Sequence, residues 1–509
     1  MRHSLLAAHD VGTNGDKCVI CDERGVVLGS SYYQYAVDYP KPSWAEQRPE
    51  LWWRAICSTT KSLLKKLRIS GNEISALSFS AQMAGMLPVD KNGRPLRACM
   101  IWLDGRSVDE ADWILRRIDR NHIYDTSGCV LTAKDVLPKI LWLKRHESRV
   151  YSRAHKFLDV KDFIEFLLTG EYVTDYSCAS YTSLFDIRRR VWSEEIAACI
   201  DLSTDKLSMP VPSTEVVGEI STGASKEIGI AAGTPVVAGG GDDMLASIGA
   251  GAVDVGECHL CLGTSGWVGV NLDHVVLDPS MRYVTLCHVI PSQWMIYAGM
   301  DCAGASLNWF EKALGSPEVD APTARNQPYR VLDSLASSVG PGSEGLLFLP
   351  YLIGERSPIM NTRTRGAFIG LSTRHTKAHL VRAILEGVAL NLAWIVESIE
   401  ESGVPVRPLR AIGGGSISDI WLQIIANATN LVVSRVTKPR EAGTIGAAIV
   451  AAVGVKVLKD FQQTKRFVHI EKDFRPEPSQ VRLYQNLLPL FRAAYQNLVD
   501  VLSDLYKMS

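Results

Sequence analysis

The chain has 509 residues, of which 46% are hydrophobic and 21% charged, and its formal net charge is -1 at pH 7. This balance excludes the broad basic field with which proteins bind nucleic acid or anionic membrane surfaces, so we expect a small-molecule partner. The length exceeds the size at which one hydrophobic core stops growing, and we expect two large domains.

The N-terminal sequence and the cysteines favour a cytoplasmic protein. The apolar stretch in MRHSLLAAHD is too short for a signal peptide, and no apolar run approaches the roughly 20 residues that cross a bilayer. The eleven cysteines are odd in number and scattered, unlike a disulfide framework. We therefore expect a cytoplasmic protein that has no membrane partner.

The first predicted elements are a strand, a tight turn and a returning strand in residues 9–20, HDVGTNGDKCVI. Residues 261–270, CLGTSGWVGV, repeat this pattern in the second half. Glycine reaches positive φ without steric cost, and the adjacent threonine adds a hydroxyl suited to a phosphate oxygen. Such a turn also occurs in hairpins that bind nothing. Two copies in two similar halves, however, predict that both turns bind one polyphosphate from opposite sides.

The two turns differ in the residue that precedes them, which is Asp10 in the first half and Cys261 in the second. A carboxylate oxygen is a ligand that Mg²⁺ prefers, so we expect the metal nearer the first half. Neither turn matches the Walker A pattern, which needs a lysine directly after its last glycine. If the chain binds a nucleotide, it therefore does so with a fold other than that of the Walker A proteins.

A further strand is predicted in residues 74–90, and helical patterns dominate from there to about residue 200. Residues 234–243, TPVVAGGGDD, predict a buried strand that ends on Asp242 and Asp243, at the edge where open α/β sheets place their chemistry. On an extended segment adjacent side chains point to opposite sides, so we expect only one of these carboxylates to face a substrate.

In the second half the sequence predicts a long helix over residues 377–402 and a strand at 409–416 that ends on glycines. A helix at 441–454 is rich in small residues, which permit close backbone packing. The segment 480–507 is amphipathic, and core packing is its expected role.

These blocks resemble the FGGY carbohydrate kinases, a family of the actin-like ATPase superfamily, over nearly the whole chain. The motifs in family order are DVGTNGDK, WAEQRPELWW, IWLDGR, VAGGGDD, LGTSG, GAFIGLSTRHTKAHLVRAILEG, AIGGGS and REAGTIGAA, and GLLFLPYLIGERSP looks most like the xylulokinase branch. The resemblance implies an α/β fold of two actin-like (ribonuclease H-like) domains around a deep cleft. We place a sugar and magnesium domain at residues 1–247 and an ATP-binding domain at 248–509.

The resemblance also implies site residues. It makes Asp242 the general base and, with Asp10, a ligand of Mg²⁺. It implies phosphate contacts from Gly12, Thr13, Asn14, Lys17, Gly263, Thr264 and Ser265. It implies adenosine contacts from Gly304, Asn308, Gly414, Gly415, Ser416 and Asp419, and substrate contacts from Gln82, Met83, Ala84, Asp104 and Asp243.

The sugar side departs from the family pattern. Xylulokinases usually carry a histidine where this chain has Ala84, and aromatic or small residues where it has Lys134 and Asp135. The charged pair either binds a more polar substrate or forms a surface salt bridge.

We expect ATP-dependent phosphorylation of a ketopentose, D-xylulose to D-xylulose 5-phosphate first. The alternatives are another pentulose or polyol, such as ribulose or a tetritol, and a non-catalytic sensor of sugar or nucleotide. The expected cofactors are ATP and Mg²⁺, and a homodimer is an open possibility.

Overall fold

The first half of the chain is built on a six-stranded sheet. The structure is a computed structural model that describes residues 4–315 and 328–508. The strands lie in the order β13-β14-β5-β1-β2-β3; β1 to β3 form an antiparallel meander, and β5 and β14 run parallel to β1. Their bounds are β1 (Leu5–Val11), β2 (Gly15–Asp22), β3 (Val27–Gln34), β5 (Ile74–Ala81), β13 (Val216–Glu219) and β14 (Pro235–Gly241).

A second sheet repeats this topology in the order β17-β18-β16-β15-β21-β22-β23. Here β15, β16 and β18 form the meander, and β21 and β22 continue parallel to β15. The bounds are β15 (Cys258–Leu262), β16 (Gly266–Leu272), β17 (Val284–Cys287), β18 (Trp294–Met300), β21 (Leu409–Ile412), β22 (Val433–Val436) and β23 (Ile470–Phe474). The duplication predicted from the two glycine turns is therefore a duplication of whole α/β domains, which confirms the fold class.

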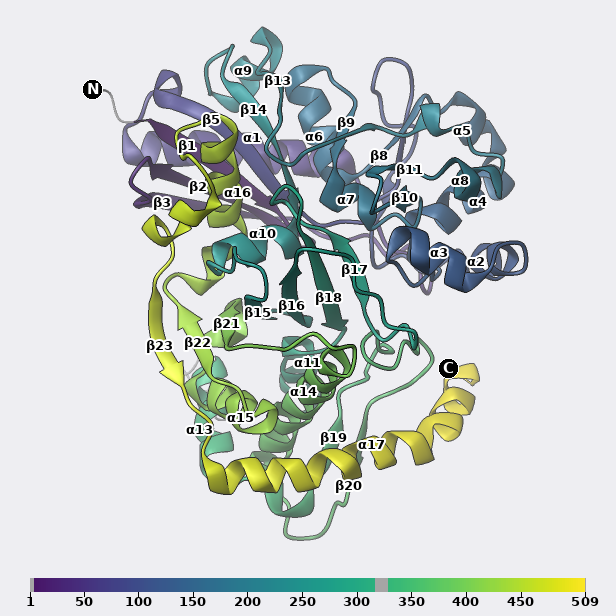
Figure 1. Ribbon diagram of the computed structural model, residues 1–509, viewed down its shortest axis with the longest axis vertical. Coiled ribbons are helices and arrows are strands. Elements are labelled where there is room, and N and C mark those ends of the chain that lie inside the picture. Colours follow the sequence, from purple (N-terminus) through teal and green to yellow (C-terminus); the bar gives the residue numbers. More distant parts are fainter. Residues whose placement is uncertain (1–3, 316–327, 509) are drawn as a thin grey trace.

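Between β5 and β14 the chain forms a group of short helices and strands beside the first sheet (Figure 1). The prediction that helices dominate there is partly wrong, because short strands pair within the segment. The long α1 (Pro49–Leu67) precedes β5, and the helices between β5 and β14 are α2 (Val108–Leu115), α3 (Arg120–Ser127), α4 (Val136–His146), α5 (Ser148–Arg153), α6 (Val160–Thr169), α7 (Tyr176–Ser180), α8 (Glu194–Ala198) and α9 (Thr222–Ile228). The short strands of this segment are β6 (Leu87–Val89), β7 (Cys99–Met100), β8 (Lys156–Leu158), β9 (Val173–Asp175), β10 (Phe185–Asp186), β11 (Val191–Trp192) and β12 (Met209–Val211), and β7 pairs with β4 (Glu46–Gln47), which precedes β5.

Two helices lie between the sheets, α10 (Asp242–Gly249) and α16 (Ala442–Gly454) (Figure 1). A Cβ placed on Gly446 would lie 2.0 Å from the carbonyl oxygen of Leu245, so only glycine allows this approach. The small residues of 441–454 thus pack backbone against backbone, as the sequence predicts. The predicted domain boundary after residue 247 falls within α10 and stays a prediction.

The helices of the second half surround its sheet. They are α11 (Gly304–Leu314), α13 (Pro328–Ser337), α14 (Lys377–Glu400), α15 (Asp419–Thr429) and α17 (Pro478–Lys507), and two further strands are β19 (Leu347–Leu349) and β20 (Ala367–Ile369). Among the described residues, α14 alone is long and apolar enough to cross a membrane, contrary to the expectation from the sequence. Most of it is buried in the core of the second domain, as befits a core helix. The long α17 follows the lower edge of the molecule in Figure 1 and buries Tyr484 and Phe491 in the same core.

Candidate functional site

Residues of both glycine turns line one pocket of about 400 Å³. The amide of Gly12 donates to the carbonyl of Gly15 in the β1–β2 turn, and the amide of Gly263 donates to the carbonyl of Ser265 in the β15–β16 turn. The lining includes Thr13 and Asn14 of the first turn and Gly263, Thr264 and Ser265 of the second. The two halves therefore contribute equivalent turns to one space.

The hydroxyl of Thr13 is held in place from two sides. The indole Nε1 of Trp102 donates to Thr13 Oγ1 over 2.8 Å, and this hydroxyl donates to Gln82 Oε1 over 3.3 Å. Gln82 also donates through Nε2 to Gln47 Oε1 over 2.8 Å. The first turn is thus connected to the side chains that line the sugar end of the pocket.

Asp242 and Asp243 both line this pocket. The prediction that only one of them faces it is wrong, because the strand β14 ends at Gly241 and the two carboxylates occupy the first turn of α10. Helical residues turn by about 100° each rather than alternating, so neighbours can share a face. Burial and the adjacent Asp243 raise the pKa of Asp242 well above its ordinary value, and burial raises the pKa of Asp243 to about 6.

Asp10 and Lys17 lie beside the first turn, outside the residues that line the pocket. Ser80 donates to Asp10 Oδ1 over 2.7 Å, and the ammonium of Lys17 donates to the carbonyl of Arg440. Burial raises the pKa of Asp10, and the charge of Asp10 in turn raises the pKa of Asp242.

This excess of negative charge fits a divalent cation, since carboxylate oxygens are the ligands that Mg²⁺ prefers. Within residues 4–315 and 328–508, no group of three or more His, Cys, Asp or Glu residues could hold a metal alone. Mg²⁺ at Asp10 and Asp242 would therefore depend on nucleotide phosphates for its other ligands.

The residues predicted to contact adenosine do not all line one pocket. Gly304 opens α11 against the second turn; its amide donates to the carbonyl of Gly263 over 3.0 Å, and a Cβ there would approach that oxygen to 2.6 Å. Asn308 accepts a hydrogen bond from the hydroxyl of Tyr329. Asp419 pairs with Arg435 and Lys472 and lines a separate hollow.

Gly414, Gly415 and Ser416 form a short 3₁₀ turn after β21. Gly415 packs on Trp421 and Leu262, and the buried Ser416 hydroxyl donates to the carbonyl of Gly413 over 2.7 Å. Open space lies where a Cβ of Gly414 would project. Among these three residues, Gly414 is therefore the one that leaves room for a flat base.

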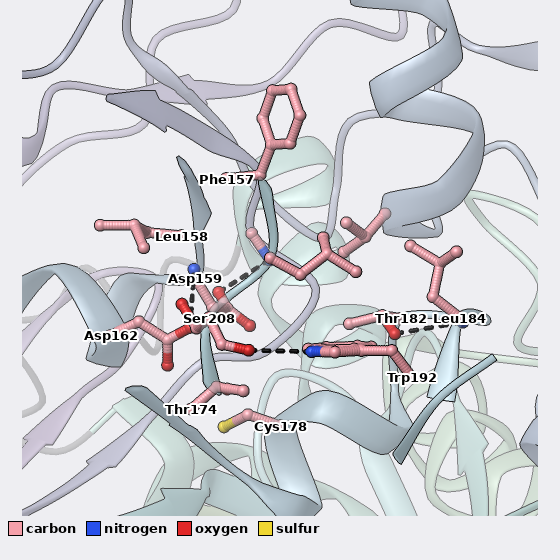
Figure 2. A pocket seen from close by; sticks show the side chains of 13 residues that line it. Phe157, Leu158, Asp159, Asp162, Thr174, Cys178, Thr182, Leu184, Trp192 and Ser208 are labelled. Carbon is pink, nitrogen blue, oxygen red and sulfur yellow. Dashed lines mark hydrogen bonds between the residues drawn. The ribbon is translucent and has the colours of Figure 1, made fainter. Parts of the chain in front are cut away.

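The sugar motif follows β5. Gln82 and Met83 line the main pocket, whereas Ala84 lines an adjoining cavity of about 70 Å³. Ala84 has φ 59°, and its carbonyl accepts a hydrogen bond from the buried Lys139 ammonium over 2.8 Å. Asp159 Oδ1 accepts from the amide of Gly85 over 2.9 Å beside a small cavity of about 20 Å³ (Figure 2). Two buried side chains therefore fix the backbone on which Ala84 sits.

Asp104 lies away from both cavities, although the family motif predicts a substrate contact for it. It is fully buried, accepts a hydrogen bond from the amide of Ala45 over 2.7 Å and forms an ion pair with Arg106 over 2.6 Å. These contacts occupy both of its oxygens. Its placement supports a structural role.

Lys134 and Asp135 do not form a surface salt bridge with each other. Asp135 is buried, and its carboxylate accepts hydrogen bonds from Thr132 and Ser183. The Lys134 ammonium instead lies 3.8 Å from Asp301. Both residues line the cavity beside Ala84, so the polar-substrate alternative agrees with their positions.

Several residues that line the pocket are missing from the sequence-based set. They include Trp102, Tyr181, Trp267, Tyr297, Asp301, Ile353 and Arg356. Arg356 lies in the GERSP segment, which indicated the xylulokinase branch but received no role. Its Nε donates to Asp301 Oδ1 over 2.7 Å, and its Nη1 donates to the hydroxyl of Tyr297 over 2.9 Å. Trp102 lies in the IWLDGR motif and Trp267 in the second glycine-turn segment, but neither received a role from the sequence, and only the fold brings these aromatic residues together.

Comparison with known proteins agrees with this architecture. The N-terminal domain model of the FGGY family of carbohydrate kinases matches residues 5–249, and the C-terminal domain model matches residues 258–455. A gluconokinase of Bacillus subtilis is 32% identical over 96% of this chain and 95% of the relative, and a xylulose kinase of Escherichia coli is 30% identical over 97% and 99%. The crystal structure of gluconate kinase from Lactobacillus acidophilus has a TM-score of 0.90 at 28% identity and covers 100% of both chains.

Both halves of the chain thus match the corresponding domains of one family, in order and over most of their length. The duplicated sheets, the paired glycine turns and the carboxylates at the start of α10 provide the structural counterpart of that match. The chain belongs to the FGGY family of carbohydrate kinases and is an ATP-dependent sugar kinase.

Proposed function

We propose that the enzyme transfers the γ-phosphate of ATP to a terminal hydroxyl of an open-chain sugar, with Asp242 as the general base. The observation that carries this proposal is that the Asp242 carboxylate lines the same pocket as both glycine turns. An alcohol is a weak nucleophile, and a base in reach of its proton supports attack on phosphorus. The raised pKa of Asp242 makes its ionised form a stronger proton acceptor.

In the proposed reaction the substrate hydroxyl gives its proton to Asp242 as its oxygen bonds to the γ-phosphorus, and the bond from that phosphorus to the ADP oxygen breaks. The amides of the two turns, with the hydroxyls of Thr13 and Thr264, stabilise the charge on the transferred group. Mg²⁺, when bound at Asp10 and Asp242, supplies neutralisation of phosphate charge. Asp243 is proposed to bind a sugar hydroxyl.

D-xylulose, yielding D-xylulose 5-phosphate, is the first candidate substrate, because relatives with this printed activity align over nearly the full chain. Gluconate is the second candidate. A relative named gluconokinase aligns equally well, and the pocket contains the cation Arg356. Ribulose and a tetritol remain alternatives with no specific structural observation in their favour.

Release of ADP from ATP and Mg²⁺ in the presence of D-xylulose, D-ribulose, erythritol and gluconate tests the proposal. We expect sugar-dependent ADP release that disappears in Asp242→Asn. Binding of sugar and ATP without turnover on any compound would instead support a non-catalytic sensor. We further propose that the enzyme acts on small molecules in the cytoplasm, and light scattering will test whether it is a homodimer.

A further inference from the structure

The glycine run that leads to Asp242 has an irregular backbone. The register of β14 against β5 shifts between Val237 and Gly240, and Gly239 has φ 65°. A Cβ on Gly239 would lie 2.1 Å from the carbonyl oxygen of Phe79, so only glycine fits there. The regular strand pairing is thus interrupted just before the two carboxylates, and other contacts fix the chain at this point.

A buried serine of α7 contacts the backbone directly after this irregularity. The amide of Gly241 donates to Ser177 Oγ over 3.0 Å. A Cβ on Gly240 would lie 2.9 Å from the same oxygen, so the absence of a side chain at residue 240 lets Ser177 approach. Gly241 ends β14, and Asp242 is the first residue of α10. The bond from Ser177 therefore fixes the peptide group next to Asp242.

The hydroxyl of Ser177 is itself oriented by Asp175. Ser177 Oγ donates to Asp175 Oδ2 over 2.5 Å, and the hydroxyl of Ser213 donates to the same oxygen over 2.8 Å. The ammonium of the fully buried Lys161 lies 3.5 Å from Asp175 Oδ1. Because the hydroxyl hydrogen of Ser177 points to Asp175, its oxygen presents its lone pairs to the amide of Gly241.

We infer that Ser177, oriented by Asp175, is a positioning residue that holds the Asp242 carboxylate where it accepts the proton of the substrate hydroxyl. Neither Ser177 nor Asp175 is among the residues that line the main pocket, so both act through the backbone of Gly241. The inference rests on the proposed function, because it assumes that Asp242 is the general base. Proton transfer requires hydrogen-bond reach, and a displacement of about 1 Å can cost about 10²-fold in rate.

Ser177→Ala removes the acceptor of the Gly241 amide and tests the inference. We expect kcat to fall about tenfold or more, because Asp242 loses its fixed position, and the KM for ATP to change less than about threefold, because the glycine turns stay in place. Steady-state kinetics with ATP and a sugar that supports turnover measure both constants.

A double-mutant cycle shows whether Ser177 acts through Asp242. In the Asp242→Asn background no base remains to be positioned, so Ser177→Ala should lower the remaining kcat less than about twofold. A general loss of packing would instead lower kcat by the same factor in both backgrounds. If Ser177→Ala does not fold, Ser177→Cys takes its place in the cycle, because a thiol is a weaker hydrogen-bond partner.

Ser180→Ala is the matched control. Ser180 is a buried serine of the same helix, and its hydroxyl accepts a hydrogen bond from the amide of Cys287 over 3.2 Å. Its replacement also leaves a buried amide without this acceptor, but at a distance from Asp242 along the chain. We expect kcat to stay within about threefold of the wild type, since the general base keeps its position.

The outcomes separate the two proposals. If Asp242→Asn alone leaves kcat unchanged, the proposed function of Asp242 fails. If Asp242→Asn lowers kcat but Ser177→Ala has the same effect in both backgrounds, or if Ser180→Ala lowers kcat as much as Ser177→Ala, Ser177 does not act through Asp242 and the inference is overturned.

Discussion

Arg356 Nε donates a hydrogen bond to Asp301 Oδ1 over 2.7 Å and so joins the GERSP segment to the end of β18. Backbone contacts reinforce the joint, since the amide of Ser357 donates to the carbonyl of Gly299 and the amide of Asp301 donates to Glu355 Oε1. Asp301 is almost fully buried, so its charge depends on this partner. The ion pair between Arg356 and Asp301 therefore fixes the position of one wall of the pocket and the charge that this wall carries.

Replacing Arg356 should destabilise the protein through the charge left behind. We expect Arg356→Ala to lower the free energy of unfolding by about 3 kcal/mol, because one partner of a largely buried ion pair is lost. Urea denaturation measures the change. The double variant Arg356→Ala, Asp301→Asn should recover part of it, and no recovery would show that the loss comes from packing alone.

The neighbouring carboxylates of α10 should differ in their effects on turnover. Asp242→Asn should lower kcat by roughly 10² or more, as loss of a general base does, while ATP binding is retained. Asp243→Asn should act mainly on the KM of the sugar. Turnover assays combined with calorimetric ATP titration measure both effects, and a larger kcat loss in Asp243→Asn than in Asp242→Asn would reverse the assignment.

The same pair predicts an acid limb in the pH profile. A general base works only when it is unprotonated, so a raised pKa moves the loss of activity to higher pH. Burial raises the pKa of Asp243 to about 6 and raises that of Asp242 well above the ordinary value. We expect kcat/KM to fall on acidification at a pH above the titration range of an ordinary carboxylate.

Asp243→Asn gives the control for this profile. It removes the neighbouring negative charge, which should lower the pKa of Asp242 and shift the acid limb to lower pH. Profiles of kcat/KM at constant ionic strength measure the shift. An unmoved limb would mean that the titrating group is not coupled to Asp243.

The contact between Gly304 and the second turn predicts a nucleotide-specific defect. A Cβ at residue 304 would lie 2.6 Å from the carbonyl oxygen of Gly263, so Gly304→Ala must displace the turn that carries Thr264. We expect the KM for ATP to rise about tenfold, as loss of about 1.4 kcal/mol of binding would cause, with the KM for sugar unchanged.

Gly340→Ala is the matched control, because its Cβ would meet no atom within 4 Å. Initial rates with varied ATP give the comparison. Equal KM values for ATP in the two variants would indicate that the second turn does not bind phosphate.

The sequence alone determined the duplicated architecture and the residues whose chemistry depends on local backbone. The turn at Gly12, the turn at Gly263 and the strand that leads to Asp242 are set by glycine spacing and apolar residues within a few positions. The small-residue pattern of 441–454 likewise predicted close packing, which α16 makes against α10.

Only the tertiary structure decided which side chains share the pocket. Asp104 lies in a motif yet pairs with Arg106, and Asp243 shares the pocket with Asp242 because β14 ends two residues before the end of the predicted strand and α10 begins at Asp242. Lys134, Asp301 and Arg356 come from three distant segments. Their proximity follows from the tertiary packing of the chain, which no local sequence pattern encodes. The set of charged side chains at this end of the pocket could therefore be identified only from the folded structure.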